Sequence, residues 1–138
     1  MTDMNAWNQS IIDEFHANAG VVGGPFEGAT VTLIHHTGAK TGTVRVNPLC
    51  CTVDNGDVII IASKAGAPTH PHWYLNLKAN PGCTVELGTE TFAATAVEVE
   101  GAERDALYAA QAAVLPQFND YVVGAGNRVI PVLRLKRK

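Results

Sequence analysis

The chain has 138 residues, a formal net charge of -3 and 46% hydrophobic residues. This length fits one domain, 1–138, and the composition excludes an intrinsically disordered chain and a uniformly basic surface that coats nucleic acid. The apolar runs are too short to span a membrane and the first residues lack the features of a signal peptide, so we expect a cytoplasmic protein.

An amphipathic helix is predicted within residues 1–20. Asp3 is suited to cap its start and Gly20 to end it. Apolar side chains recur at helical spacing at Trp7, Ile11, Ile12, Phe15 and Ala19. The polar face carries Asp13 and Glu14 and no Lys or Arg, which is wrong for binding anionic lipid. We therefore expect this helix to pack on its own domain.

From Thr30 onward, runs of β-branched and apolar residues alternate with turn residues. Strands are predicted at 30–37, 44–53, 58–63, 83–87, 91–99 and 129–135, and helices at 72–78 and 102–115. The Asn55-Gly56 and Gly88-Thr89 pairs are suited to hairpin turns. About six strands joined mostly by hairpins predict a mainly β domain over 30–135, an antiparallel barrel or curled sheet with flanking helices.

Two further details of the strands are predicted from composition. The run from Val58 to Ala62 has no polar residue, so we expect that strand to be buried on both faces. Pro131 lacks a backbone N–H, which predicts that the last strand lies at an edge or contains a bulge.

The segment from His36 to Arg45 joins the first two predicted strands and is a candidate anion site. Gly38 and Gly42 flank a Lys-Thr pair, and Arg45 begins the next strand. Such a loop can bind an anion through peptide N–H groups, the point charge of Lys40 and the fork of the arginine. An ordinary hairpin with solvated charges is the alternative.

Basic residues gather in the middle of this acidic chain. Between residues 30 and 80 the only acidic residues are Asp54 and Asp57, both in a predicted hairpin turn. The same stretch holds four basic residues, Lys40, Arg45, Lys64 and Lys78. Lys64 follows Ser63 where the most apolar strand ends, a common place for ligands. The distribution favours a local site for a polyanion.

Two aromatic residues follow the loop that begins with Ser63 and Lys64. Trp73 and Tyr74 stand at the start of a predicted short helix, where they can stack on a flat ligand while the helix N–H groups bind its polar edge. The alternative is that Trp73 and Leu77, and with them Tyr74, only pack the helix onto the barrel. For Leu77 this is the better interpretation.

Histidine and cysteine pairs do not predict a metal site or thiolate catalysis. Adjacent residues on a strand point to opposite faces, so neither His35 with His36 nor Cys50 with Cys51 forms a chelating pair. The two cysteines also lack a neighbouring His-Asp arrangement that would activate a nucleophile. We expect no metal.

Several motifs in fixed order resemble the deazaflavin-dependent nitroreductase family, which includes F420H2-dependent quinone reductases of actinobacteria. They are Thr37-Gly38-Ala39-Lys40-Thr41-Gly42-x-x-Arg45-Val46-Asn47-Pro48-Leu49, then Ala62-Ser63-Lys64-x-Gly66-Ala67-Pro68, then Pro71-x-Trp73-Tyr74-x-Asn76-Leu77-x-Ala79-Asn80-Pro81, and the tail Arg128-Val129-Ile130-Pro131-Val132. The resemblance covers about residues 30–135 and implies an FMN-binding split-barrel-like fold, a split β-barrel.

The resemblance implies that coenzyme F420, an 8-hydroxy-5-deazaflavin with a phospholactyl-oligoglutamate tail, is the cofactor. By this resemblance Lys40, Thr41, Arg45 and Lys64 bind the anionic tail, and residues of the other motifs line the ring. The full set of residues implied to bind the cofactor is Ala39, Lys40, Thr41, Arg45, Val46, Asn47, Pro48, Leu49, Cys50, Cys51, Ala62, Ser63, Lys64, His72, Trp73, Tyr74, Leu75 and Asn76.

The implied reaction is hydride transfer from reduced deazaflavin to a quinone, an α,β-unsaturated carbonyl or a nitroaromatic compound. Tyr121 and Ser63 are the candidate catalytic hydroxyls, with water as the alternative proton source. Relatives often carry several tyrosines where this chain has Phe118 and Tyr121, and aromatics where it has Cys50 and Cys51. The substrate pocket is therefore expected to have fewer aromatic and hydroxyl groups.

Two other functions stay open. An FMN-dependent oxidoreductase on the same barrel would bind a single phosphate, whereas the spread of Lys40, Arg45 and Lys64 suits a longer anionic tail. A non-catalytic protein that binds or carries a deazaflavin is the second alternative. The expected partner is a small-molecule electron acceptor and not nucleic acid; oligomeric state and peripheral contact with the inner membrane face are not determined.

Overall fold

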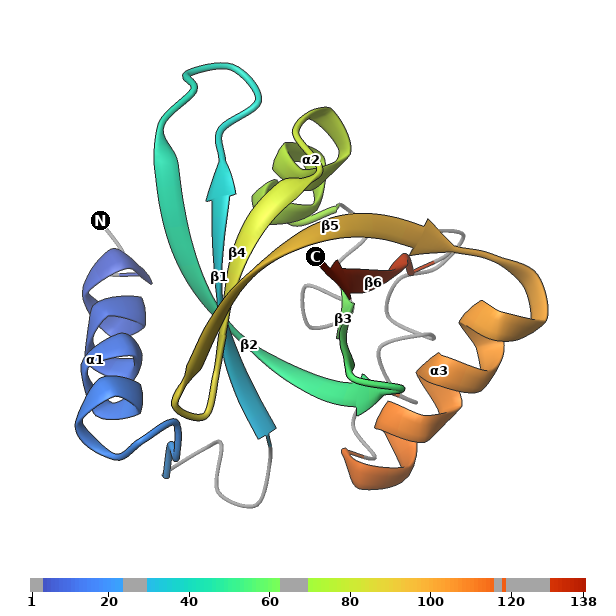
Figure 1. The fold of residues 1–138 in the computed structure, drawn as a ribbon, viewed down its shortest axis with the longest axis horizontal. Coiled ribbons are helices and arrows are strands. Elements are labelled where there is room, and N and C mark those ends of the chain that lie inside the picture. The colour runs from blue at the N-terminus through green and yellow to red at the C-terminus, as the bar shows by residue number, and fades with distance from the viewer. Residues whose placement is uncertain (1–3, 24–29, 63–69, 116–117, 119–129) are drawn as a thin grey trace.

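The computed structural model describes residues 4–23, 30–62, 70–115, 118 and 130–138. In this part of the chain six strands form a closed barrel and three helices lie around it (Figure 1). In chain order the elements are α1 (Met4–Ala17), β1 (Thr30–Thr37), β2 (Val44–Asp54), β3 (Asp57–Ile61), α2 (His72–Ala79), β4 (Gly82–Leu87), β5 (Glu90–Val99), α3 (Gly101–Val114) and β6 (Val132–Arg137). The predicted mainly β barrel with flanking helices is confirmed.

All neighbouring strands in the barrel are antiparallel. Their order is β1-β2-β3-β6-β5-β4, and β4 returns to pair with β1. Both predicted hairpins are present. Asn55 and Gly56 take φ angles of 52° and 84° between β2 and β3, and Gly88 takes 60° between β4 and β5. Positive φ at these positions is the backbone geometry that such turns require.

The interior of the barrel is one hydrophobic cluster, which we call the barrel core. Every strand contributes to it, and α2 closes it with Trp73, Tyr74 and Leu77. Its strand residues are Ile34, Cys51, Val58, Ile60, Cys83, Val85, Ala94, Leu133 and Leu135, together with Ala62 after β3. The alternative stated for the α2 aromatics, packing of the helix onto the barrel, is therefore found for both rings and for Leu77.

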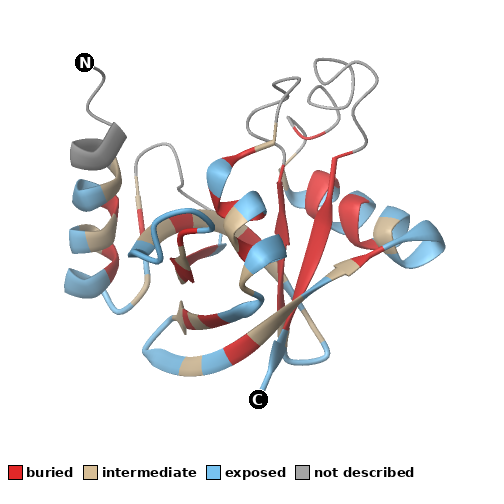
Figure 2. Cartoon of the chain, turned by 90° about the horizontal axis from the view of Figure 1, so that it is seen from above, coloured by how far each residue is buried: buried red, intermediate tan, exposed pale blue. Residues whose placement is uncertain are grey.

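Strand β3 is buried on both faces, as its apolar composition predicts. Val58 and Ile60 point into the barrel core, whereas Ile59 and Ile61 belong to a second cluster that includes Leu107 and Tyr108 of α3. Figure 2 shows this burial as red along the strand and along the facing side of the helix. Because side chains alternate along a strand, one face of β3 packs in the barrel core and the other packs against α3.

Helix α1 packs on the outer face of β1. Ile11 and Phe15 contact a cluster that contains Val31 and Leu33, and the exposed residues of the helix face away from the barrel (Figure 2). The prediction that this helix packs on its own domain is confirmed; Asp3, its predicted cap, lies outside the described residues. The helix ends at Ala17, before Gly20. A Cβ at Gly20 would stand 2.5 Å from the Cα of Gly88, so this crossing requires glycine.

The prediction for Pro131 is wrong. Strand β6 lies between β3 and β5 inside the closed barrel, and it begins at Val132, one residue after the proline. The missing N–H therefore removes no bond from the ladder, while the carbonyl of Pro131 accepts a hydrogen bond from the N–H of Ala62 at 2.9 Å.

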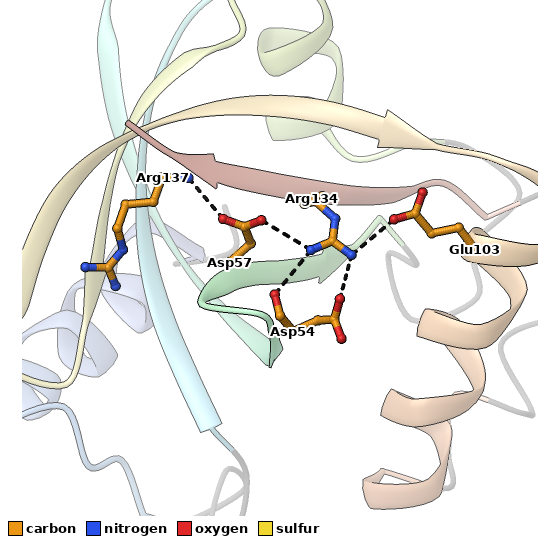
Figure 3. Close-up of polar contacts among 5 residues, drawn as sticks. All are labelled: Asp54, Asp57, Glu103, Arg134 and Arg137. Atoms are coloured by element: carbon orange, nitrogen blue, oxygen red, sulfur yellow. Dashed lines mark hydrogen bonds and ion pairs between the residues drawn. The ribbon is translucent and has the colours of Figure 1, made fainter.

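A buried arginine joins the β2–β3 hairpin to β6 and α3. Arg134 is 9% exposed, and its guanidinium lies 2.6 Å from Asp54, 3.2 Å from Asp57 and 3.1 Å from Glu103 (Figure 3). The backbone N–H of Arg137 donates to the other oxygen of Asp57. Both acidic residues of the central basic segment are thus engaged in this cluster.

Among the described helices, none is long and apolar enough to cross a membrane.

Candidate functional site

A cleft of about 770 Å³ opens beside the ends of β1 and β2, under the start of α2. The cleft is lined by the N-terminal half of β2, the loop 38–43, the start of α2 and one residue of α1, Asn8. The predicted cofactor residues that line it are Ala39, Lys40, Thr41, Arg45, Val46, Asn47, Pro48, Leu49, His72, Trp73, Leu75 and Asn76. Two motifs far apart in the sequence thus meet at one cleft.

The loop 38–43 is a closed turn whose peptide donors are mostly used within the protein. The N–H of Gly38 donates to the carbonyl of Thr43 at 2.8 Å, and the N–H of Gly42 donates back to Gly38 at 3.0 Å. The N–H of Thr43 donates to the Thr41 hydroxyl oxygen, and that of Ala39 to the side chain of Asn76. The side chain of Lys40, the charged residue of this loop, is therefore available to an anion, together with that of Arg45 on β2.

Two glycines allow this turn. Gly42 has a φ of 70°, which L side chains rarely adopt. A Cβ at Gly38 would stand 2.7 Å from the hydroxyl oxygen of Thr41, so a side chain there would displace Thr41. The backbone thus requires glycine at position 42, and Gly38 leaves room for the Thr41 hydroxyl. The turn presents Lys40 and Thr41 at the cleft.

The electrostatics of the cleft are basic. Lys40 and Arg45 both line it, and no aspartate or glutamate does so in the part of the chain that the structure describes. Asp54 and Asp57, the acidic residues nearest in the sequence, are held by Arg134. A charged ligand in the cleft therefore meets positive charge that no acidic lining residue offsets.

Helix α2 supplies an apolar wall and a set of N–H groups. Pro71 precedes the helix without a side-chain cap, so the first N–H groups of α2 are not capped by that residue. Trp73 is 7% exposed and belongs both to the cleft and to the barrel core, whereas Leu75 is 48% exposed at the rim. This wall can contact a flat apolar ligand and hydrogen-bond its polar edge.

Tyr74, predicted to line the ring site, does not line the cleft. Its ring lies in the barrel core and its hydroxyl donates to Glu98 at 2.6 Å. Burial, together with the hydrogen bond and the charge of Glu98, raises the pKa of Tyr74 above its ordinary range. The phenol is therefore neutral at physiological pH and serves the fold.

Three other predicted residues also lie away from the cleft. Cys51 and Ala62 are in the barrel core, and Cys50 is half-buried on β2. Burial raises the pKa of Cys50, and burial with the charge of Cys50 raises that of Cys51 to about 12, so both are thiols at neutral pH. The predicted residues Ser63, Lys64 and Tyr121 lie outside the described residues.

Four residues outside the predicted cofactor set also line the cleft: Asn8, His36, Gly38 and Pro71. His36 and Gly38 belong to the predicted anion segment and Pro71 to a family motif, whereas sequence reasoning missed Asn8 altogether. Of these, His36 makes the most contacts with other lining side chains. Its Nε2 lies 2.7 Å from Oδ1 of Asn47, and its Nδ1 lies 3.1 Å from Nδ2 of Asn76. Strand alternation could have found it, because His36 follows Ile34 by two residues and so shares its inward face.

Comparisons with known proteins agree on one family. The model of the F420H2-dependent quinone reductase family matches residues 7–136. An F420H2-dependent quinone reductase of Mycobacterium tuberculosis is 35% identical over 127 residues, which are 90% of this chain and 85% of the relative. A putative F420H2-dependent quinone reductase of Mycobacterium bovis matches equally well.

Solved structures support the same assignment. An F420H2-dependent reductase superposes with a TM-score of 0.71 and 37% identity, covering 77% of this chain and 93% of that one. A structure described as a domain-swapped dimer gives a TM-score of 0.73 and 32% identity, covering 96% of this chain and 98% of that one. The chain therefore belongs to the F420H2-dependent quinone reductase family, oxidoreductases whose cofactor is coenzyme F420.

Proposed function

We propose that the cleft between loop 38–43, β2 and α2 is the F420 site of a reductase that passes a hydride to an electron-poor acceptor. The observation that carries this proposal is that one cleft joins a basic wall, with Lys40 and Arg45, to an apolar wall with Trp73. F420 has the same division, a flat ring and a polyanionic tail. The volume of about 770 Å³ also lies in the range usual for small-molecule sites.

In this arrangement the tail lies along the loop 38–43. The ammonium of Lys40 and the guanidinium of Arg45 bind its phosphate and carboxylates, and the Thr41 hydroxyl adds a donor. Lys64, which follows the most apolar strand in the sequence, stays a predicted further cation for this tail. A spread of cations suits an anionic chain better than the single phosphate of FMN.

Residues of β2 and α2 would hold the ring. Val46, Pro48 and Leu49 offer an apolar surface on one side and Trp73 and Leu75 on the other. When bound, reduced F420 supplies a hydride from C5 of its deazaflavin. The residues of the chain orient the ring, and their apolar side chains exclude water from the face toward the acceptor.

The acceptor is proposed to be a quinone, with α,β-unsaturated carbonyl and nitroaromatic compounds as further substrates. Addition of a hydride to a quinone places negative charge on its oxygen, which a hydroxyl can stabilise or protonate. Tyr121 and Ser63 stay the predicted hydroxyl donors, with water as the alternative source. Tyr74 is not a candidate because its phenol is committed to Glu98.

We propose a cytoplasmic location. The three cysteines of the chain, Cys50, Cys51 and Cys83, are all free thiols in the structure. Free thiols persist in a reducing compartment. The F420 site itself requires a compartment that contains reduced deazaflavin.

Titration of the purified protein with oxidised F420 and, separately, with FMN tests the cofactor assignment. We expect saturable binding of F420, followed by its fluorescence, and much weaker binding of FMN. Turnover of reduced F420 with menadione then separates a reductase from a carrier. Tight FMN binding without F420 binding would favour the FMN enzyme, and F420 binding without menadione turnover would favour a carrier.

A further inference from the structure

His36 occupies the junction of three walls of the cleft. It is 1% exposed on β1, stands opposite Arg45 in the strand register, and lines the cleft beside the loop 38–43. A polar side chain that is buried at the edge of a ligand site needs partners for its hydrogen-bonding atoms. The partners of His36 come from two different elements, β2 and α2, so the imidazole connects these elements.

A chain of hydrogen bonds runs through the imidazole. Oδ1 of Asn76 accepts from the N–H of Ala39 at 2.9 Å, so the amide nitrogen of Asn76 faces Nδ1 of His36 at 3.1 Å. Nδ1 must then be the acceptor, and the ring proton resides on Nε2, which donates to Oδ1 of Asn47 at 2.7 Å. Every donor in the chain meets an acceptor, which selects the neutral Nε2–H form.

We propose that His36 is a positioning residue for the cofactor: in its neutral Nε2–H form it ties Asn47 of β2 to Asn76 of α2 and, through the Asn76–Ala39 bond, fixes Lys40 relative to α2. The inference rests on the proposed F420 site. We call this set of hydrogen bonds the latch. Lys40 is one residue from Ala39, so the latch fixes the position of the Lys40 backbone relative to the apolar wall that Trp73 and Leu75 form on α2. His36 itself need not contact the cofactor.

The charges around His36 favour the same neutral form. Burial lowers the pKa of His36, a lowering that the Asn47 hydrogen bond opposes and that the charges of Arg45 on β2 and His35 on β1 reinforce. Lys40 of the loop and His72 of α2 are the other basic residues at this cleft, and no carboxylate lines it among the described residues. A second ring proton would point at the amino group of Asn76 and break the latch.

Nitrogen NMR of the imidazole rings tests the latch without the cofactor. In wild type we expect the neutral Nε2–H form of His36 at neutral pH, and we expect it to persist below the ordinary histidine pKa of 6.5. Asn76→Asp places a carboxylate at Nδ1, and we expect it to protonate both ring nitrogens at neutral pH. An Nδ1–H form in wild type overturns the proposal. An unchanged ring in Asn76→Asp also overturns it, because it would show that the side chain at position 76 does not contact Nδ1.

Amide hydrogen exchange gives a second readout that is independent of F420. His36→Phe keeps an aromatic ring at this position but removes both hydrogen bonds, and we expect the Ala39 amide to exchange at least about tenfold faster. His36→Gln retains a donor and an acceptor on one side chain, and we expect it to restore part of the protection. Unchanged exchange of Ala39 in His36→Phe contradicts the latch.

A double-mutant cycle with Lys40 connects the latch to the cofactor. We expect Lys40→Ala to raise the Kd for oxidised F420 roughly tenfold in wild type and less than about twofold in His36→Phe, because the charge is no longer held in place. If the effects of Lys40→Ala and His36→Phe on the Kd are additive, His36 does not position Lys40 and the proposal is overturned. If Lys40→Ala leaves the wild-type Kd unchanged, the F420 site fails, while the NMR and exchange results still decide whether the latch exists.

Discussion

The hydroxyl of Tyr74 lies 2.6 Å from Oε1 of Glu98, and this bond turns the ring away from the cleft that its neighbour Trp73 lines. Lys78 donates to the same carboxylate oxygen at 3.2 Å. We therefore expect Tyr74→Phe to lower the free energy of unfolding by about 1.5 to 3 kcal/mol, the usual contribution of a hydrogen bond to a charged group. The Kd for F420 should stay unchanged. Denaturant unfolding and F420 titration check both expectations. A raised Kd at unchanged stability would contradict the placement of Tyr74 in the barrel core.

Trp73 belongs to the cleft and to the barrel core at once, so its loss should affect both properties. We expect Trp73→Ala to lower the free energy of unfolding by about 3 to 5 kcal/mol and to weaken F420 binding. Leu75→Ala is the matched control, because Leu75 lines the same wall but is 48% exposed. It should weaken F420 binding with little loss of stability. A Trp73→Ala variant that melts like wild type would show that this ring is not part of the core.

Adjacent positions on α2 show where sequence reasoning ends. The motif indicates that an aromatic pair stands at the helix start, but Trp73 and Tyr74 point in directions about 100° apart, and only the packed barrel decides which one meets the cleft. The strand runs and hairpins were predictable, because period-two alternation and positive-φ turn residues are local signals. The pairing of β1 with β4 that closes the barrel is not local, and neither is the position of Pro131 just outside β6.

Glu86 of β4 contacts two imidazoles, His16 on α1 and His35 on β1, and the first of these contacts ties α1 to the barrel. Its carboxylate lies 2.8 Å from Nε2 of His16 and 2.6 Å from Nε2 of His35. Burial acts to raise the pKa of Glu86, but the hydrogen bonds and charges of the two histidines together hold it below its usual 4.5. A depressed folded-state pKa stabilises the fold above that ordinary value, and the gain is lost as pH falls through the folded-state pKa.

We therefore expect Glu86→Gln to lower the free energy of unfolding by about 1 kcal/mol at neutral pH. The difference from wild type should shrink below pH 4.5, where the wild-type carboxyl also takes up a proton. Urea unfolding at a series of pH values measures it. A difference that stays constant across the series would show that the carboxylate charge does not hold the helix.

Gln111 is 1% exposed on α3, and neither atom of its amide has a hydrogen-bond partner among the described residues. An unsatisfied buried amide costs about 1 to 3 kcal/mol, so we expect Gln111→Met to raise the free energy of unfolding by a similar amount. Ala110→Met, at an exposed position of the same helix, is the control and should have little effect. A lower Tm for Gln111→Met would indicate that the amide has a partner in the part of the chain that is not described.

Binding of the F420 tail by Lys40 and Arg45 is the central feature of the proposed site. Steady-state reduction of menadione by reduced F420, with Lys40→Ala and Arg45→Ala beside wild type, tests it most directly. Each lost charge-assisted bond is worth about 1.5 to 3 kcal/mol, so we predict KM for reduced F420 to rise at least tenfold, with a weaker salt dependence and a nearly unchanged kcat. An unchanged KM with a collapsed kcat would place these residues at the reacting centre and contradict the account.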